Sequence, residues 1–451
     1  KESKDANINY NGTASITGGL VKVDGALMVT RGGTLKIADD VALTTAVAET
    51  PASKLDGAIY VGIKGSATAN HENTTLSTLE LSSAKLSQFL NSDKETITDG
   101  ETAVTDGKGQ VSVGLGGRIH LTDSNQVEIS QFAFNNEAGA GHINVEGIDS
   151  TASGLQDATA INQHFQVDTN ANAMDGTRSI VANNMSIGKT LVADSSVDKD
   201  NDWEQVASGN SSFAFRFEAN DLTLGSEKGT LNDDTSWNGF DSKDQIGAHE
   251  LKAHKSITFI DGRSDTFYLQ DDVVLDTTLG SDNVLGSAAN SNTGTLKGDD
   301  VVIGYDNGSG STSGSLKVAG GAWSTTQGQS ITVADGSLTV SAQAGTDETD
   351  GLDLDGTNND IYYAGGVATS LTINGGSFVI DKSEHGSNAS VTVSGAKGAT
   401  AMLDLRGTSV TWGSGSVTIT GDSVRDSKSD ILSDAGEGQV FITGAQFKDF
   451  I

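Results

Sequence analysis

The stretch that decides the fold of this 451-residue chain is Leu27-Met-Val-Thr-Arg-Gly-Gly-Thr-Leu-Lys-Ile37. Its apolar residues stand at positions 1, 3, 9 and 11 of the stretch, on both sides of a Gly-Gly pair. Apolar residues that alternate with polar ones predict a β-strand with one buried face, and glycine tolerates the backbone angles of a tight corner. The stretch therefore predicts a unit of strand, corner and strand.

The same unit returns further along the chain. Val111-Ser-Val-Gly-Leu-Gly-Gly-Arg-Ile-His-Leu121 matches it position for position. Leu371-Thr-Ile-Asn-Gly-Gly-Ser-Phe-Val-Ile380 has one residue fewer before the glycines, and partial copies occupy residues 16–23 and 316–323. Towards the C-terminus, several strand starts are 22 to 26 residues apart, which is about one turn of a three-sided β-helix; they fall near residues 316, 338, 391, 417 and 440.

Composition supports ordered sheet rather than a disordered linker. The chain has 56 Gly and a single Pro, and stacked strands need glycine in their turns while they exclude proline from their ladders. The predicted fold is therefore all-β, a right-handed parallel β-helix (β-solenoid) with loop insertions and little helix. Short helices are expected within residues 76–90 and 157–165.

Changes in the regularity of this pattern predict three regions. Residues 1–150 form an N-terminal β-solenoid part with an insertion, and residues 253–451 form a C-terminal β-solenoid part. Between them, residues 151–252 are rich in Asn and Asp and have irregular strand spacing, so we expect an inserted or side region there.

Charge and cysteine content exclude several classes of function. A formal net charge of -32 opposes binding to nucleic acid or to anionic membranes, because phosphates would be repelled over the whole surface. The chain has no Cys, so it contains neither disulfides nor thiolate metal sites. No apolar run approaches the roughly 18 to 20 residues that a transmembrane helix needs, so no transmembrane segment is expected.

The Gly-Gly units, with Gly336-Ser-Leu-Thr-Val340 and Ser370-Leu-Thr-Ile-Asn-Gly-Gly-Ser377, resemble the passenger regions of bacterial autotransporter adhesins. The resemblance covers residues 14–37, 111–121 and about 315–447. It implies a non-enzymatic protein on the outer surface of a bacterium or outside the cell. Its expected partners are other copies of itself, or a protein or glycan of a host or neighbouring cell.

One acidic segment is a candidate metal site. Asp353, Asp355 and Asp360 lie within eleven residues that are rich in Asp and Asn, and calcium prefers several carboxylate and carbonyl oxygens in one loop. Calcium is the one cofactor that the sequence suggests. A solvated loop and a pair of catalytic carboxylates are the alternatives for this segment, and a second, weaker calcium-like spacing joins Asp282 to Asp300.

Tyr362 and Tyr363 are the candidate binding residues. Exposed aromatic rings serve as stacking platforms for sugars, and adjacent residues of a strand point to opposite faces. One of the two rings is therefore expected in the core and the other at the surface.

Three functions follow, in order of preference. The first is an adhesin-like β-solenoid that mediates attachment to a cell surface. The second is a self-assembling structural subunit of a surface filament or S-layer, with residues 7–11 and 440–451 as the strands that would pair with the next copy. The third is a β-helix enzyme that acts on polysaccharide, and the sequence shows no carboxylate cluster with a neighbouring basic residue to support it.

Overall fold

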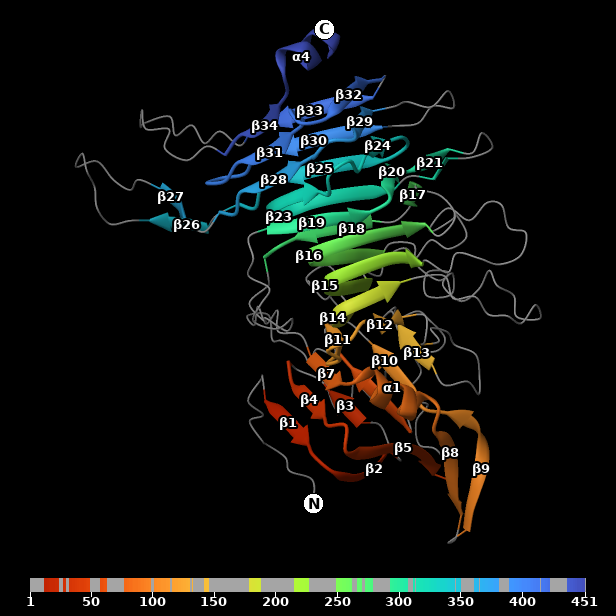
Figure 1. The fold of residues 1–451 in the computed structure, drawn as a ribbon. Coiled ribbons are helices and arrows are strands. Elements are labelled where there is room, and N and C mark those ends of the chain that lie inside the picture. Colours follow the sequence, from red (N-terminus) through yellow and green to blue (C-terminus); the bar gives the residue numbers. More distant parts are fainter. Residues whose placement is uncertain are drawn as a thin grey trace, which may run out of the picture. The chain divides into compact units, whose positions relative to one another are not determined.

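Most described residues of this computed structural model lie in β-strands, which confirms the all-β class (Figure 1). Two helices occur among them, α1 (Ser83–Leu90) and α4 (Gly444–Phe450). The structure describes residues 12–23, 27–29, 32–48, 57–62, 77–98, 101–113, 116–129, 132, 142–145, 178–187, 215–226, 249–261, 266–269, 272–278, 293–306, 311–312, 314–344, 346–349, 361–364, 366–380, 389–413, 415–421 and 436–450.

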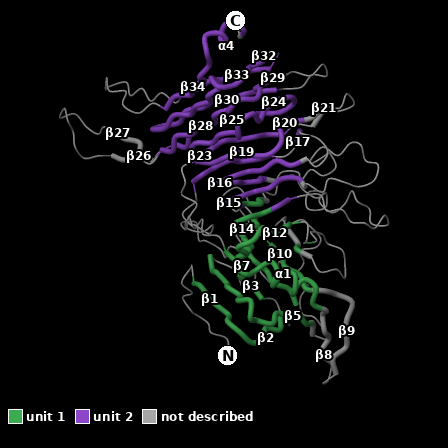
Figure 2. The backbone as a smooth tube through the Cα atoms, in the orientation of Figure 1, with its two compact units in different colours: residues 1–185, 192–218, 246–249 green, residues 186–191, 219–245, 250–451 purple. Residues whose placement is uncertain are grey.

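The chain divides into two compact units (Figure 2). Unit 1 comprises residues 1–185, 192–218 and 246–249, and unit 2 comprises residues 186–191, 219–245 and 250–451. The long strand β15 (Phe215–Ser226) contributes residues to both. The expected division into residues 1–150, 151–252 and 253–451 stays a prediction.

Unit 2 contains three stacks of parallel strands, here named ladders A, B and C. Ladder A consists of residues 250–253 of β16 (His249–Asp261), β18 (Asp272–Asp276), residues 315–318 of β23 (Ser315–Thr325), β25 (Ser337–Ser341), β30 (Ser390–Ser394) and β33 (Ser416–Thr420). Ladder B consists of residues 256–259 of β16, β19 (Thr293–Gly298), residues 321–325 of β23, β28 (Thr369–Thr372), β31 (Ala401–Asp404) and β34 (Gly438–Phe441). Ladder C consists of β17 (Thr266–Leu269), β20 (Asp300–Ile303), β24 (Ile331–Val333), β29 (Ser377–Ile380) and β32 (Ser409–Trp412).

The chain visits these ladders in a fixed order. It runs from A to B to C and then returns to A, as in the succession β25, β28, β29, β30, β31, β32. Antiparallel hairpins extend from the connections: β21 (Tyr305–Asp306) pairs with β22 (Ser311–Thr312), and β26 (Thr346–Thr349) pairs with β27 (Ile361–Ala364). Insertions are thus accommodated between strands without breaking the ladders.

Alternate residues of each strand form the core of unit 2. Leu316, Leu338 and Val391 pair in register on ladder A, and each is at most 1% exposed. Burial of one such side chain stabilises the fold by roughly 1.5–3 kcal/mol, so stacked rows of them hold the ladders together. On ladder B, Trp323 pairs with Gly294, and a Cβ at Gly294 would lie only 2.6 Å from the indole ring. Trp323, the largest buried side chain of the described part, therefore requires a neighbour without a side chain.

Unit 1 repeats this arrangement with three further stacks, named ladders D, E and F. Ladder D consists of β1 (Thr13–Ile16), β4 (Thr34–Ile37), β7 (Ser77–Leu81), β11 (Gly117–Leu121) and residues 179–182 of β14 (Arg178–Ile187). Ladder E consists of β2 (Gly19–Val23), β5 (Val41–Ala48) and β8 (Asp93–Thr98), and ladder F of β3 (Leu27–Val29), β6 (Ala58–Val61), β10 (Gln110–Val113) and β13 (His142–Val145). An antiparallel hairpin joins β8 to β9 (Glu101–Lys108), and β12 (Val127–Glu128) follows β11.

The predicted corners are present in both units. The first stretch forms β3 and β4 around Gly32, and the second forms β10 and β11 around Gly116; both glycines have positive φ, 76° and 66°. The shortened copy likewise forms β28 and β29 around Gly375 and Gly376. These strand-corner-strand predictions are confirmed.

The predicted repeat of strand starts holds for four of the five positions. Leu316, Leu338, Val391 and Val417 are in register on ladder A, whereas Val440 pairs with Leu403 on ladder B. Spacing alone cannot separate the two ladders, because every strand shows the same alternation whichever ladder it joins.

Two further expectations concern helices and the C-terminal strand. The helix within residues 76–90 is confirmed as α1, although residues 77–81 form β7 before it; residues 157–165 lie outside the described part. Residues 440–451 do not form one pairing strand, because β34 ends at Phe441 and residues 444–450 form α4. Residues 7–11 lie outside the described part.

Candidate functional site

The structure leaves the predicted calcium site untested. Asp353, Asp355, Asp360 and Asp282 lie outside the described residues, so the metal site stays a prediction. Asp300 is described: it begins β20, and its Oδ1 accepts a hydrogen bond from the backbone N–H of Ser330 at 2.7 Å.

The two candidate tyrosines lie in the inserted hairpin of unit 2. Tyr362 and Tyr363 belong to β27, where they pair with Glu348 and Asp347 of β26. Whether they bind a ligand stays a prediction.

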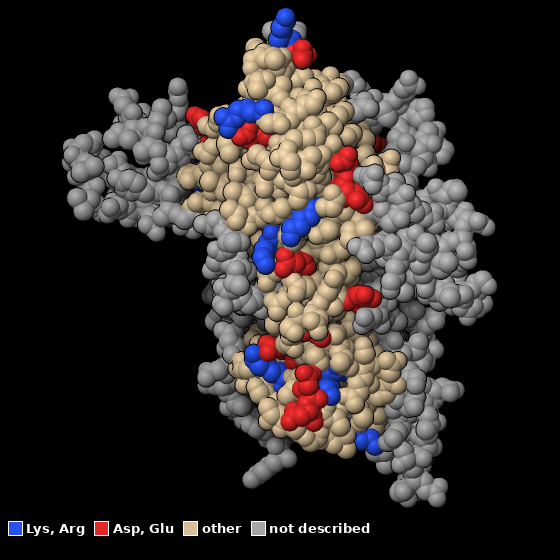
Figure 3. Space-filling view, in the orientation of Figure 1, with Lys and Arg blue, Asp and Glu red and all other residues tan. Residues whose placement is uncertain are grey.

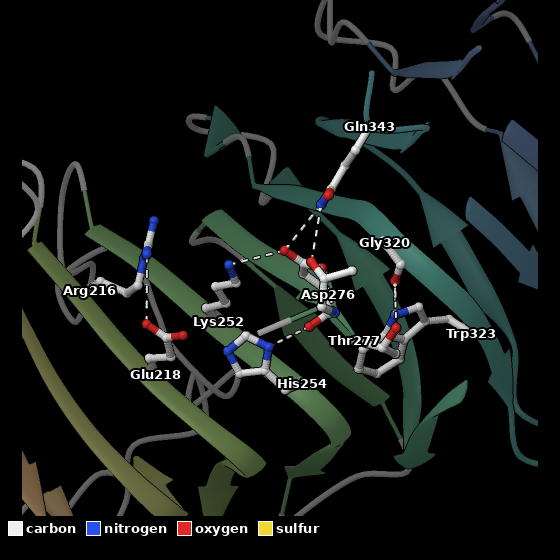
Figure 4. Close-up of polar contacts among 10 residues, drawn as sticks. Arg216, Glu218, Lys252, His254, Asp276, Thr277, Gly320, Trp323 and Gln343 are labelled. Carbon is white, nitrogen blue, oxygen red and sulfur yellow. Dashed lines mark hydrogen bonds and ion pairs between the residues drawn. The ribbon is translucent and has the colours of Figure 1, made fainter. Parts of the chain in front are cut away.

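A buried polar cluster at the corner between ladders A and B is the candidate site that the described residues provide (Figure 4). Its centre is Asp276, the last residue of β18. Oδ2 of Asp276 lies 3.1 Å from Nζ of Lys252 and accepts a hydrogen bond from Nε2 of Gln343 at 3.3 Å. Oδ1 accepts a hydrogen bond from the backbone N–H of Thr278 at 2.9 Å and another from the Thr278 hydroxyl. Both carboxylate oxygens thus have partners.

Burial and charge act in opposite directions on this carboxyl group. Burial favours the neutral acid, but the ammonium group of Lys252 and the hydrogen bonds from Thr278 outweigh it and hold the pKa of Asp276 below its ordinary value of 3.8. The side chains of Lys252 and Asp276 are 15% and 8% exposed. The carboxylate is therefore ionised, and the pair is largely shielded from water.

The backbone next to Asp276 is tied to the following strand. The N–H of Thr277 donates to the carbonyl oxygen of Gly320 at 3.1 Å, and the indole N–H of Trp323 donates to the same oxygen at 3.0 Å. His254 is fully buried, and its Nδ1 lies 2.5 Å from the carbonyl oxygen of Asp276. Because a carbonyl oxygen only accepts hydrogen bonds, Nδ1 is the donor of this contact.

Two glycines make this close packing possible. A Cβ at Gly320 would lie 2.3 Å from Oδ1 of Asp276, and a Cβ at Gly321 would lie 1.9 Å from Oγ1 of Thr277. The register of β18 against β23 also shifts after Leu275, so that Asp276 pairs with Gly320. The Gly320–Gly321 pair thus forms a bulged corner with room for the cluster.

Unit 1 has a charged row on the outward side of ladder D. Nζ of Lys36 lies 2.8 Å from Oε1 of Glu80, and Nδ1 of His120 lies 3.5 Å from Oε2 of Glu80. Burial lowers the pKa of His120 below its ordinary value of 6.5, although the neighbouring Glu80 opposes that shift. His120 is therefore neutral at neutral pH.

The described contacts of both groups are with other residues of the protein. The Asp276 carboxylate uses both of its oxygens on the protein itself, and its low pKa makes it a poor general base at neutral pH. Within the described ranges, no group of three or more His, Asp or Glu side chains is arranged to hold a metal ion.

Sequence reasoning missed the Asp276 cluster almost entirely. The partial Gly-Gly copy at residues 316–323 pointed to the corner, but nothing pointed to Asp276 or to Gln343, which lies 67 positions away. Side chains from successive passes of the chain meet only after the strands are stacked.

Comparisons with known proteins add no identity. The chain matches no protein-family model, no curated protein and no solved structure. Among the helices of the described part, neither is long and apolar enough to cross a bilayer.

Proposed function

We propose that this chain is a non-enzymatic bacterial surface protein, a right-handed parallel β-helix that mediates attachment to a cell surface as adhesins do. The observation that carries the proposal is the fixed order in which the chain visits ladders A, B and C in unit 2. Its insertions lie in the connections between ladder strands. A repeating coil of this kind is a stiff support whose loops can vary without disturbing it.

The β-helix is the simplest path that connects the three ladders. Each time the chain returns from ladder C to ladder A, it forms a strand that pairs in parallel with the previous strand of ladder A. Each turn of the chain therefore adds one strand to each ladder. Parallel strands joined by crossover connections are right-handed in nearly all proteins, which supports the same hand here.

An attachment role fits the distribution of polar groups better than catalysis does. The described buried cluster at Asp276 has its hydrogen bonds satisfied within the protein. On the face shown in Figure 3, acidic and basic side chains of the described residues lie in small groups, several of them mixed, among wide uncharged areas. Such a surface suits a protein or a neutral glycan as partner, and the net charge of -32 disfavours nucleic acid.

The insertions of unit 2 are the natural contact elements of such a coil. The hairpin of β26 and β27 carries Tyr362 and Tyr363, whose aromatic rings are suited to stacking on sugars. An extracellular location is supported by the resemblance to autotransporter passengers and by the absence of cysteine.

A self-assembling surface subunit is the second candidate. Ile419 of β33 is 52% exposed, and neither β33 nor β34 has a charged residue. Exposed edge strands usually carry charges or proline that prevent pairing with another chain. These two strands lack such protection, which favours association between copies.

An attachment assay with two deletion variants tests the first proposal. Residues 345–365 are replaced by a short Gly-Ser linker in one variant, and residues 307–310 are replaced in a control variant. Beads coated with the first variant should lose binding to cells or to arrayed glycans, while the control and the unfolding temperature stay unchanged. Equal binding by all three proteins would contradict the proposal, and ordered filaments in negative-stain images would favour the second candidate.

A further inference from the structure

The inserted hairpin of unit 2 has a defined root. The backbone N–H of Gln343 donates to the carbonyl oxygen of Val367 at 3.0 Å, and the N–H of Val367 donates back to Gln343 at 3.0 Å. This antiparallel bridge closes residues 344–366, which include β26 and β27. The hairpin thus leaves ladder A directly after β25 and returns directly before β28.

The same residue that closes the root also reaches the buried cluster. Nε2 of Gln343 donates to Oδ2 of Asp276 at 3.3 Å and lies 3.5 Å from Oγ1 of Thr278 (Figure 4). The carboxylate that it contacts is ionised and already paired with Lys252. A hydrogen bond to a charged acceptor is stronger than a bond between neutral groups.

The glycine corner brings the two together. A Cβ at Gly320 would lie 3.2 Å from Nε2 of Gln343 and 2.3 Å from Oδ1 of Asp276, so a larger residue there would separate the amide from the carboxylate. The Gly-Gly pair therefore positions the hairpin root as well as the strand bend.

A two-stranded hairpin is marginally stable by itself, so its direction must be fixed at its base. We propose that Asp276 and Gln343 form a latch that fixes the root of the hairpin of β26 and β27 to the coil. Lys252 and Thr278 hold the carboxylate, Gln343 connects it to the root, and the hairpin is presented in one orientation. Gln343 and Asp276 are positioning residues for this element. The consequence for attachment rests on the proposed function, but the latch itself does not.

Hydrogen exchange on the intact chain tests the latch. In Gln343→Ala, the amides of residues 343 and 367 and those of β26 and β27 should exchange about tenfold faster, which corresponds to the loss of one hydrogen bond to a charged group. The amides of β25 and β28 should keep their protection, because their ladder partners are untouched. Gln439→Ala is the matched control. Gln439 lies on β34, and its side-chain amide donates a hydrogen bond to the exposed Glu437.

Three further outcomes are decisive. Asp276→Asn should accelerate exchange in the hairpin as Gln343→Ala does. Unchanged exchange at the root in Gln343→Ala would overturn the latch. Faster exchange throughout ladders A and B in Gln343→Ala would also overturn it, because the cluster would then stabilise the whole coil rather than the hairpin. Attachment measured on the same variants separates the two proposals: altered exchange with unchanged attachment would contradict the proposed role of the hairpin and leave the latch intact.

Discussion

The outward sides of ladder A in unit 2 and of ladder D in unit 1 are built differently on the same parallel frame. On ladder A, the outward positions of β25, β30 and β33 are Ser or Thr, and all are at least partly exposed. On ladder D, the outward residues Thr78, Arg118, His120 and Ser179 are buried, whereas Lys36 and Glu80 on the same side are 46% and 22% exposed. An alternating strand therefore has one core face in both units, while its second face meets water in one and is partly covered in the other.

The two units also differ in the titratable group that is shielded from water. The covered face of unit 1 holds His120, whose pKa is lowered mainly by burial. In unit 2 the shielded charge is Asp276, which is kept ionised by Lys252 and Thr278. Unit 1 therefore contains a group that is sensitive to mild acid, and unit 2 contains one that responds only to strong acid.

Removal of the largest buried side chain of the described residues should have the largest effect, and that effect should be confined to unit 2. Trp323→Ala is expected to lower the free energy of unfolding by about 3–5 kcal/mol, because it deletes a buried ring and leaves a cavity. Gly294→Val should be destabilising for the opposite reason, since its side chain would overlap the indole. Urea unfolding, followed through hydrogen exchange of the amides of β28 in unit 2 and β11 in unit 1, checks both variants. Equal loss of protection in the two strands would contradict the distinction between the units.

The corner glycines should have an intermediate effect that separates backbone strain from packing. Gly321 and Gly328 both have positive φ, 78° and 91°, but only a Cβ at Gly321 meets another atom, whereas none lies within 4 Å at Gly328. Gly328→Ala should therefore cost about 1–2 kcal/mol for the backbone alone, and Gly321→Ala clearly more. Thermal unfolding of the two variants measures the difference, and equal costs would show that Thr277 adjusts without penalty.

The smallest expected effect is a pH dependence in unit 1. Because the pKa of His120 is lower in the folded chain than its ordinary value of 6.5, the unfolded chain binds a proton first as the pH falls. The stability contribution is complete above pH 6.5 and is lost progressively below it. The groups facing His120 are Glu80, Lys36 and Arg118, and the first of these partly offsets the loss.

Unfolding experiments at pH 7.5 and pH 5.5 check this effect through the amides of β11, with β25 as internal reference. His120→Gln should remove part of the pH dependence of β11 and leave β25 unchanged. If His120→Gln kept the full pH dependence of β11, that dependence would have to come from groups other than His120. For Asp276 the pH dependence has the same direction but a different cause: Lys252 and Thr278 stabilise its charged form, so its lowered pKa contributes stability that is present above 3.8 and is lost only below it.

The amount of structure that the sequence predicted depends on how local each feature is. The corners at Gly32, Gly116 and Gly375 were predictable because the alternation and the positive-φ glycines lie within eleven residues. The helix α1 was also predictable, since its apolar residues recur at helical spacing and Ser82 caps its first turn. The assignment of Val440 to ladder B was not, because alternation is the same on every ladder.

By itself, then, the sequence determined the strand, the corner and the all-β class, since these follow from side-chain period and from the conformational freedom of glycine within a short segment. Only the tertiary structure decided which strands are neighbours, which outward faces are buried, and that Asp276 meets Lys252 and Gln343. The physical reason is that neighbouring strands of a parallel ladder are separated in sequence by one complete turn through the other ladders. The number of residues in that turn changes with every insertion, so the sequence spacing does not show which strands pair.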